Sequence, residues 1–281
     1  NGNIGGVFNL ANNGGVFSYS QTSGPNPWSQ VNNGLPMTWL RTNTVALDRG
    51  TGDFVVAAFS REEQLDSASA GLYVYNGTNW RRIAADVFTS SVNITSIVVS
   101  PAIDNLSFAV GTAQRGVFVT TDGGDHFTQW SSQLPSLAVN LPTIFRVTAL
   151  NWESDRLLVA MPSWGLFISD DGGQTFRVSR IRVLKNLDAA SDTTTVLPTL
   201  NDFSVQADSP DHIVAALVQH GAFESIDGGV SWQDLYGNLV VPLPGAPTAW
   251  QHSAIDIVFD AADPQIIVMG VSQKGLYRTA D

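Results

Sequence analysis

The stretch Gly165–Phe176, which reads Gly-Leu-Phe-Ile-Ser-Asp-Asp-Gly-Gly-Gln-Thr-Phe, contains the pattern that decides the fold. In its first residues the side chains of Leu166 and Ile168 would lie on one face of a strand and that of Phe167 on the other. The glycine pair that follows can take the positive φ angles of a tight turn. Asp171 can accept hydrogen bonds from the N–H groups of that turn, and Thr175 and Phe176 begin a returning strand. The stretch therefore predicts a β-hairpin corner.

This corner recurs along nearly the whole chain. Thr120–Phe127 repeats it with histidine in the threonine position, and Ser225–Trp232 repeats it with serine there. Degenerate copies follow Gly71 and Gly15, and Gly275 starts a sixth copy. The lead glycines stand at positions 15, 71, 116, 165, 221 and 275, so that neighbours lie 45 to 56 residues apart. A period of this length is that of a four-stranded propeller blade.

The repeat predicts an all-β fold, a β-propeller of six visible four-stranded blades. We number the blades 1 to 6 in chain order; blade 1 lacks an expected first strand and blade 6 an expected fourth strand. We expect residues 1–281 to form a single propeller domain that is a fragment or processed piece of a longer chain. A six-bladed ring closed by pairing of its two ends and a ring with a seventh blade remain alternatives.

The corner motif resembles the Asp-box, or bacterial neuraminidase repeat. This repeat occurs in sialidases, xyloglucan-degrading hydrolases, the luminal domain of sortilin and photosystem II assembly propellers. The resemblance implies a structural motif at the turn between the third and fourth strands of a blade, on the face away from the ligand. Its structural residues would be Asp122, Gly124, Asp171, Gly173, Asp227 and Gly229. Because one fold hosts many activities, the resemblance implies a scaffold rather than a reaction.

Composition excludes several classes of function. The formal net charge of −11 disfavours nucleic acid and anionic membrane surfaces, which are bound through cationic side chains. The chain has no cysteine, and therefore no disulfide, thiol catalysis or thiolate metal site. No apolar run approaches the roughly 20 residues of a membrane helix, so we expect no membrane insertion. The habit of the similar families and the start at Asn1 favour an extracytoplasmic location: secreted, periplasmic or at the cell surface.

A ligand site is expected on the face opposite the corners, where the second and third strands of each blade are joined. The residue before the lead glycine differs from blade to blade in chemistry, and amides precede three of these residues. The predicted ligand-binding face consists of Arg115, Trp164, His220 and Lys274 with Gln114, Gln219 and Gln273. An aromatic platform with hydrogen-bonding neighbours suits a glycan or a peptide. The alternative is that these turn residues are polar for solubility alone.

The catalytic pattern of sialidase-like enzymes is incomplete. Arg41, Arg115 and Arg146 could hold a carboxylate, but the other expected elements are missing. Asp202, at the start of an inner strand, is the one carboxylate that could act as an acid or base. Glu62, Glu63 and Asp66 cluster on one loop and are more simply interpreted as solvated charge.

Neither a metal site nor a cofactor is predicted. The four histidines are scattered over separate turns, without the short spacings of metal ligands. The Asp-Gly-Gly corners lack the alternating oxygen ligands and the terminal glutamate of a calcium loop.

Two functional hypotheses follow. The first is a non-catalytic extracytoplasmic propeller that binds a protein or glycan partner through the loop face opposite the corners. The second is a glycoside hydrolase module, either sialidase-like or xyloglucanase-like. A structural unit of a larger surface assembly is a third interpretation.

Overall fold

The computed structural model describes residues 16–19, 28–35, 40–47, 55–61, 70–100, 106–113, 115–130, 149–153, 156–161, 164–184, 195–196, 199–235, 253–260 and 262–279. These residues form strands and turns, and none of them is helical. The chain divides into two compact units, one of residues 1–157 with 171–174 and one of residues 158–170 with 175–281. Each unit is described by itself.

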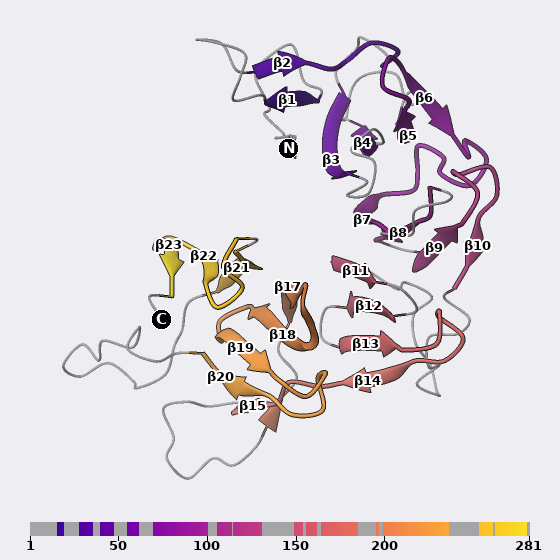
Figure 1. Cartoon of the computed structure of the whole chain (residues 1–281). Helices are drawn as coiled ribbons and strands as arrows, with labels where there is room; N and C mark the ends of the chain where they lie inside the picture. The colour runs from indigo at the N-terminus through magenta and orange to yellow at the C-terminus, as the bar shows by residue number, and fades with distance from the viewer. Residues whose placement is uncertain are drawn as a thin grey trace. The chain divides into compact units, whose positions relative to one another are not determined.

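The strands of the first unit form consecutive antiparallel hairpins (Figure 1). Blade 1 contributes a pair, β1 (Phe17–Tyr19) and β2 (Trp28–Gln30). Blades 2 and 3 are four-stranded sheets in chain order: β3 (Leu40–Leu47), β4 (Val55–Arg61), β5 (Gly71–Tyr75) and β6 (Trp80–Ile83), then β7 (Ile94–Val99), β8 (Phe108–Thr112), β9 (Val117–Thr120) and β10 (Thr128–Gln129). Four hairpin-connected strands in sequential order are the unit that the repeat predicted.

The remaining blades follow the same order. Blade 4 consists of β11 (Ala149–Glu153), β12 (Arg156–Met161), β13 (Gly165–Ser169) and β14 (Arg177–Ser179). Blade 5 consists of β17 (Leu200–Gln206), β18 (Ser209–Leu217), β19 (Gly221–Ser225) and β20 (Gln233–Asp234). Blade 6 has three described strands, β21 (Ala254–Phe259), β22 (Ile267–Val271) and β23 (Gly275–Arg278). The all-β blade architecture is confirmed, and the three complete corner motifs join third to fourth strands.

Two features differ from the expected strands. β18 begins at Ser209 and includes Pro210, although a proline has no N–H group to donate to a ladder. Pro210 lies before Ile213, the residue at which the pairing with β19 begins, so that its missing N–H costs that ladder nothing. An additional hairpin, β15 (Val183–Leu184) with β16 (Thr195–Val196), lies in the connection between blades 4 and 5.

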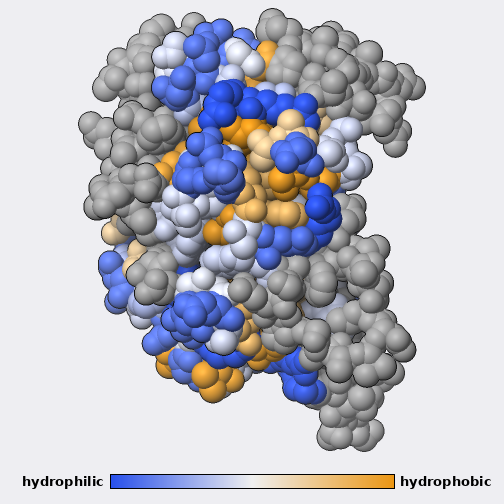
Figure 2. Space-filling model, turned by 90° about the vertical axis from the view of Figure 1, so that its right-hand side faces the viewer, coloured by the Kyte–Doolittle hydropathy of each residue, from blue (hydrophilic) through white to orange (hydrophobic). Residues whose placement is uncertain are grey.

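The core lies between successive blades. In the first unit, Leu72 and Val74 of β5 belong to one buried cluster with Ile94, Phe108 and Val110 of the next blade. Side chains of a strand alternate between its two faces, so a third strand can pack against both neighbouring blades. In the first unit, strands that are covered on both faces have all of their residues buried, as in β8 and β9. Outer strands are more polar, and Figure 2 shows hydrophilic residues beside hydrophobic ones on one side of the molecule.

The corner glycines are packed against the preceding blade. A Cβ atom on Gly124 would lie 2.4 Å from the Ile83 Cδ1 atom, and one on Gly173 would lie 2.1 Å from the ring of Trp130. A Cβ atom on Gly229 would meet the side chain of Ser179 at 2.9 Å. Glycine therefore serves two needs at these positions: a φ between +83° and +94°, and a close approach between blades.

Asparagines on β-bulges connect the innermost strands. Asn43 and Asn201 are each the extra residue of a bulge in the first strand of a blade. The Asn43 Nδ2 atom donates to the carbonyl oxygen of Ile94 at 3.2 Å, and Asn201 Nδ2 donates to that of Ala254 at 2.7 Å. Ile94 and Ala254 are themselves the residues before the bulge of the next blade. These side chains thus bridge strands that share no backbone ladder.

We expect Gly124→Ala to destabilise the protein more than Gly123→Ala. Both glycines have positive φ, at +94° and +75°, but a Cβ atom on Gly123 has nothing within 4 Å. The matched pair therefore separates backbone strain, which both variants share, from the clash with Ile83. Urea unfolding should show an additional loss of about 1–3 kcal/mol for Gly124→Ala, the usual cost of overpacking. Equal losses would contradict the packing role of Gly124.

Candidate functional site

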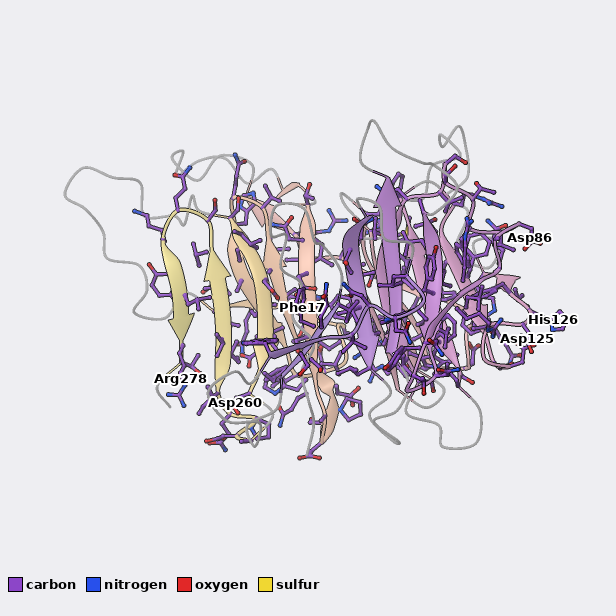
Figure 3. All side chains as sticks on the ribbon, turned by 90° about the horizontal axis from the view of Figure 1, so that it is seen from above. Phe17, Asp86, Asp125, His126, Asp260 and Arg278 are labelled. Atoms are coloured by element: carbon purple, nitrogen blue, oxygen red, sulfur yellow. The ribbon has the colours of Figure 1, made fainter. Side chains whose placement is uncertain are left out.

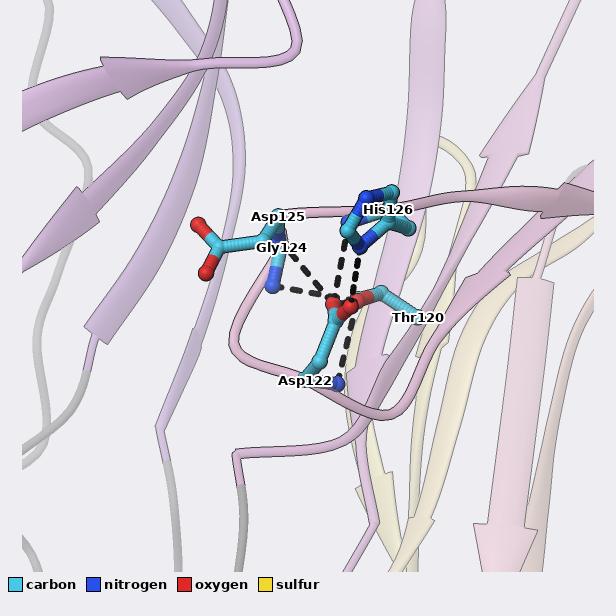
Figure 4. A network of polar contacts seen from close by, with 5 residues as sticks. All are labelled: Thr120, Asp122, Gly124, Asp125 and His126. Atoms are coloured by element: carbon cyan, nitrogen blue, oxygen red, sulfur yellow. Dashed lines mark hydrogen bonds and ion pairs between the residues drawn. The ribbon is translucent and has the colours of Figure 1, made fainter.

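The corner of blade 3 is held by Asp122 (Figure 4). Its Oδ1 atom accepts hydrogen bonds from the N–H groups of Asp125 at 3.1 Å and His126 at 3.0 Å, and from the Thr120 hydroxyl at 2.8 Å. The Thr120 hydroxyl, which is buried, accepts in turn from the Gly124 N–H at 3.0 Å. These bonds, led by that of the His126 N–H, hold the pKa of the Asp122 carboxyl well below its usual range.

Blade 5 repeats this network with serines. The Asp227 carboxylate accepts from the N–H groups of Val230 and Ser231, at 3.0 and 2.9 Å, and from the hydroxyls of Ser225 and Ser231. The Ser231 hydroxyl contributes most to lowering the pKa of Asp227 to about 2. Because their oxygens are already used by donors of the turn, the corner aspartates act as structural acceptors. Among the residues that the structure describes, no group of three metal-ligating side chains is found.

The turns that join second to third strands lie at the other end of each sheet. In the second unit they present Trp164, Gln219, His220, Gln273 and Lys274. Gln219 and Gln273 occupy equivalent positions and both have a φ of +61°, a conformation that non-glycine residues adopt at a cost. The Gln219 N–H donates to the Ser253 hydroxyl of blade 6 at 3.0 Å, so this turn is tied to the neighbouring blade.

The residues next to the lead glycines differ in exposure. Trp164 and His220 are half-buried, whereas Lys274 is exposed. Partial burial lowers the pKa of the His220 imidazole, which favours its neutral form at pH 7. A neutral imidazole can both donate and accept a hydrogen bond. The second unit therefore offers an indole, an imidazole, an ammonium group and two amides on turns at equivalent ends of their sheets.

Arg115 belongs to the first unit and is engaged within it. Its Nη1 atom donates to the carbonyl oxygen of Val87 at 3.0 Å, and its guanidinium lies 5.2 Å from the ring centre of Phe118. This arrangement directs the guanidinium towards its own unit, although the residue remains exposed. Gln114, the remaining predicted residue of this face, lies outside the described residues.

A pair of carboxyl groups connects the first strands of blades 5 and 6. Asp202 follows the bulge of β17, Asp256 follows the bulge of β21, and their side chains are hydrogen-bonded to each other. The Ile257 N–H also donates to Asp202 Oδ2, at 3.4 Å. Burial, followed by the hydrogen bond and the charge of Asp256, raises the pKa of Asp202 to about 7. At neutral pH the Asp202 carboxyl is therefore protonated over part of its population.

This geometry does not match a glycosidase pair. Inverting glycosidases separate their two carboxyl groups by roughly 6.5–9.5 Å and retaining ones by about 5–5.5 Å, because the sugar and water lie between them. Two carboxyls in direct hydrogen-bond contact leave no such space. The sequence singled out Asp202 but missed Asp256. The signal was present, since the two aspartates lie 54 residues apart, as do the lead glycines Gly221 and Gly275.

A second polar network was not predicted from the sequence. The His212 Nε2 atom lies 2.6 Å from Glu224 Oε1, its Nδ1 atom contacts the Gln206 amide, and its ring packs edge-on against Phe259 at 4.8 Å. Glu224 also accepts from Gln233 at 2.9 Å. Since both imidazole nitrogens are occupied by neighbouring side chains, the network joins strands and offers no nitrogen to a substrate.

The other carboxylates and arginines considered above lie outside the described side chains. These are Glu62, Glu63, Asp66, Arg41 and Arg146. No helix of the described chain is long and apolar enough to cross a membrane.

Comparison with solved structures shows the propeller fold. An ancestral GH74 enzyme superposes with a TM-score of 0.60 and 14% identity, over 99% of this chain and 36% of that one. The GH74 enzyme of Niastella koreensis gives 0.52 and 14%, over 95% and 49%. YCF48 from Cyanidioschyzon merolae gives 0.52 and 16%, over 94% and 76%. The chain thus spans half or less of these GH74 enzymes, and at such identities the likeness establishes the fold alone.

The sequence itself matches no protein-family model, and a search of the curated proteins finds no match.

We expect the stability of the wild type to fall as pH rises from about 4 to about 7. An aspartate has a pKa near 3.9 when unfolded, so across this range the folded state binds more protons than the unfolded state. Asp202→Asn should remove most of this fall, which is at most about 4 kcal/mol because one pKa unit corresponds to about 1.4 kcal/mol. Urea unfolding at pH 5 and pH 8 measures the effect. A wild-type slope that the variant retains would argue against the raised pKa of Asp202.

The pKa of His126 should fall towards its ordinary value of about 6.5 in Asp122→Asn. The hydrogen bond between His126 Nδ1 and Asp122 Oδ2, 2.7 Å long, raises the pKa of the imidazole in the wild type. Asp125→Asn is the matched control, because Asp125 contributes less to the pKa of His126. An NMR titration of the imidazole protons distinguishes the variants. An equal change in both would show that general charge, and not the corner hydrogen bond, sets the pKa.

Proposed function

We propose that this chain is a non-catalytic extracytoplasmic propeller that binds a protein or glycan partner through the turns opposite the corner motifs. The observation that carries the proposal is the set of dissimilar side chains on equivalent turns of the second unit, around Trp164, His220 and Lys274. Such turns vary freely because the sheets beneath them are fixed by other contacts. The corner end, by contrast, directs its aspartates into its own turns.

The chemistry of these turns suits a neutral, hydrogen-bonding ligand. A half-buried indole offers an apolar surface for a sugar ring or an apolar side chain. The neutral imidazole of His220 and the amides of Gln219 and Gln273 supply both donors and acceptors. Lys274 adds one donor with a positive charge. This combination favours hydroxyl groups or peptide groups over a phosphate-rich ligand, which would need several cations.

A glycoside hydrolase is the second candidate. It is supported by the fold shared with GH74 enzymes and by the raised pKa of Asp202, which would suit a general acid. The direct hydrogen bond between Asp202 and Asp256 weighs against it, because the carboxyl groups of such enzymes stand apart. The extracytoplasmic location rests on the family resemblance of the corner motif.

The proposal is tested with immobilised glycans and with extracellular proteins, using the wild type, Trp164→Ala and Lys274→Ala. We expect at least a tenfold loss of binding for Trp164→Ala, a factor that corresponds to about 1.4 kcal/mol. Val230→Ala, an exposed apolar residue on a corner, is the control and should bind as the wild type does. Binding that is insensitive to Trp164 and Lys274 would refute the assignment of this face.

The enzyme hypothesis is tested in parallel. The wild type and Asp202→Asn are incubated with β-glucans, xyloglucan and sialosides, and reducing sugar or free sialic acid is measured. We expect no turnover by either protein. Turnover that Asp202→Asn abolishes would establish the hydrolase and overturn the non-catalytic proposal.

A further inference from the structure

The corner of blade 2 carries an asparagine where the corners of blades 3 to 5 carry an aspartate. Asn76 directly follows β5, and Gly77 comes next in the turn that leads to β6. The Asn76 Oδ1 atom accepts hydrogen bonds from the N–H groups of Thr78 at 3.1 Å and Asn79 at 2.8 Å. Asp122 accepts from the N–H groups of its own turn in the same way. Asn76 therefore occupies the place of the corner aspartate in this blade.

An asparagine that is followed by glycine can lose its side-chain amide without an enzyme. The backbone nitrogen of the glycine attacks the side-chain carbonyl carbon, so that a new C–N bond forms. The Cγ–Nδ2 bond breaks, and ammonia leaves together with the former N–H proton of the glycine. Water then opens the cyclic imide at either of its two carbonyl groups, which gives aspartate or isoaspartate. Glycine favours the first step because it has no side chain to hinder the approach of its nitrogen.

The geometry of the blade 2 corner favours this reaction. Residues 76–79 are all exposed, so water reaches the turn; the corner of blade 3 is open in the same way, with Asp125 and His126 exposed (Figure 3). Among the described residues, none accepts from the Gly77 N–H, and a Cβ atom on Gly77 would meet nothing within 4 Å. The two N–H groups that bind Asn76 Oδ1 are placed to stabilise the negative charge that develops on this oxygen during the attack.

Asn33 and Gly34 form the other Asn-Gly pair that the structure describes, and here the contacts oppose the reaction. The Asn33 carbonyl oxygen accepts from the Trp80 N–H at 2.8 Å, and a Cβ atom on Gly34 would clash with the Trp80 carbonyl oxygen. The Asn33 Nδ2 atom also donates to the Thr78 carbonyl oxygen at 3.3 Å. Closure of the imide ring turns the peptide group between the two residues, which would break the bond to Trp80. The two pairs thus share a sequence but differ in their freedom to react.

We propose that Asn76 is a site of spontaneous self-modification, at which the folded corner of blade 2 converts its asparagine into aspartate and isoaspartate. The aspartate product supplies the carboxylate that Asp122 and Asp227 supply in blades 3 and 5. It retains the acceptor oxygen for the two N–H groups of the turn, and a carboxylate accepts such bonds more strongly than an amide does. One product of the reaction therefore completes the corner motif in this blade.

The isoaspartate product has the opposite effect on the corner. It adds a methylene group to the backbone of the turn between Tyr75 and Trp80, which are paired across the hairpin. Trp80 is buried, and its indole Nε1 atom donates to the Val31 carbonyl oxygen at 2.7 Å. A longer turn displaces this side chain and weakens the contact between blades 1 and 2.

The test follows deamidation of the full chain during incubation at mildly alkaline pH, by mass spectrometry of its peptides. In the folded protein we expect Asn76 to react at least roughly tenfold faster than Asn33, a factor that corresponds to about 1.4 kcal/mol of activation free energy. In guanidinium chloride, where the fold is lost, the two pairs should react at similar rates. A protease that cleaves at aspartate but not at isoaspartate separates the two products.

Two variants complete the test. Gly77→Ala should slow the reaction at Asn76 and leave that at Asn33 unchanged, with tryptophan fluorescence as the check that the variant is folded. Asn76→Asp, which represents the aspartate product, should unfold at a urea concentration at least as high as that of the wild type. Equal rates at Asn33 and Asn76 in the folded protein, or an Asn76 that reacts only after unfolding, would overturn the proposal. A destabilised Asn76→Asp would contradict the role given to the aspartate product.

Discussion

The fold depends on the close contact between each corner glycine and the blade before it. At Gly124, Gly173 and Gly229 there is no space for a Cβ atom, because a side chain of the preceding blade fills it. At Gly124 and Gly229 the turn is fixed by a buried hydroxyl and an aspartate, which accept hydrogen bonds from its N–H groups. Polar turn chemistry and close packing between blades are thus coupled at the corners of Gly124 and Gly229.

This coupling has a consequence for function. The corner aspartates accept hydrogen bonds from their own turns and keep low pKa values, so they have little capacity left for a ligand. The opposite ends of the sheets carry side chains that no repeat constrains, such as Trp164 and His220. Between the two ends, Asp202 of the inner strand β17 accepts a hydrogen bond from the Ile257 N–H of β21, a strand with which β17 shares no ladder.

The sequence predicted what repeats and missed what does not. Lead glycines that return every 45 to 56 residues, with Asp-Gly-Gly corners in three of the repeats, indicate the strand order and the positions of these corners. The bulge asparagines Asn43 and Asn201 were not predicted, because a bulge depends on register and leaves no turn residue as a marker. The partner of Asp202 was missed for a similar reason, because Asp256 lies on the first strand of the neighbouring blade and is far from Asp202 in the sequence. The hydrogen bond from Arg115, a residue predicted for the ligand face, to the carbonyl oxygen of Val87 was likewise not predicted, because it depends on how a long side chain lies in three dimensions.

The most direct test of the central claim is native-state hydrogen exchange of the corner amides. The N–H groups of Gly124 and Gly229 donate to the buried hydroxyls of Thr120 and Ser225, so their exchange should require unfolding of the blade. We therefore expect these two amides to be among the most protected, and the amide of Gln273 in the opposite turn to exchange much faster. Corner amides that exchange as fast as that of Gln273 would contradict the claim that the corners hold the blades together.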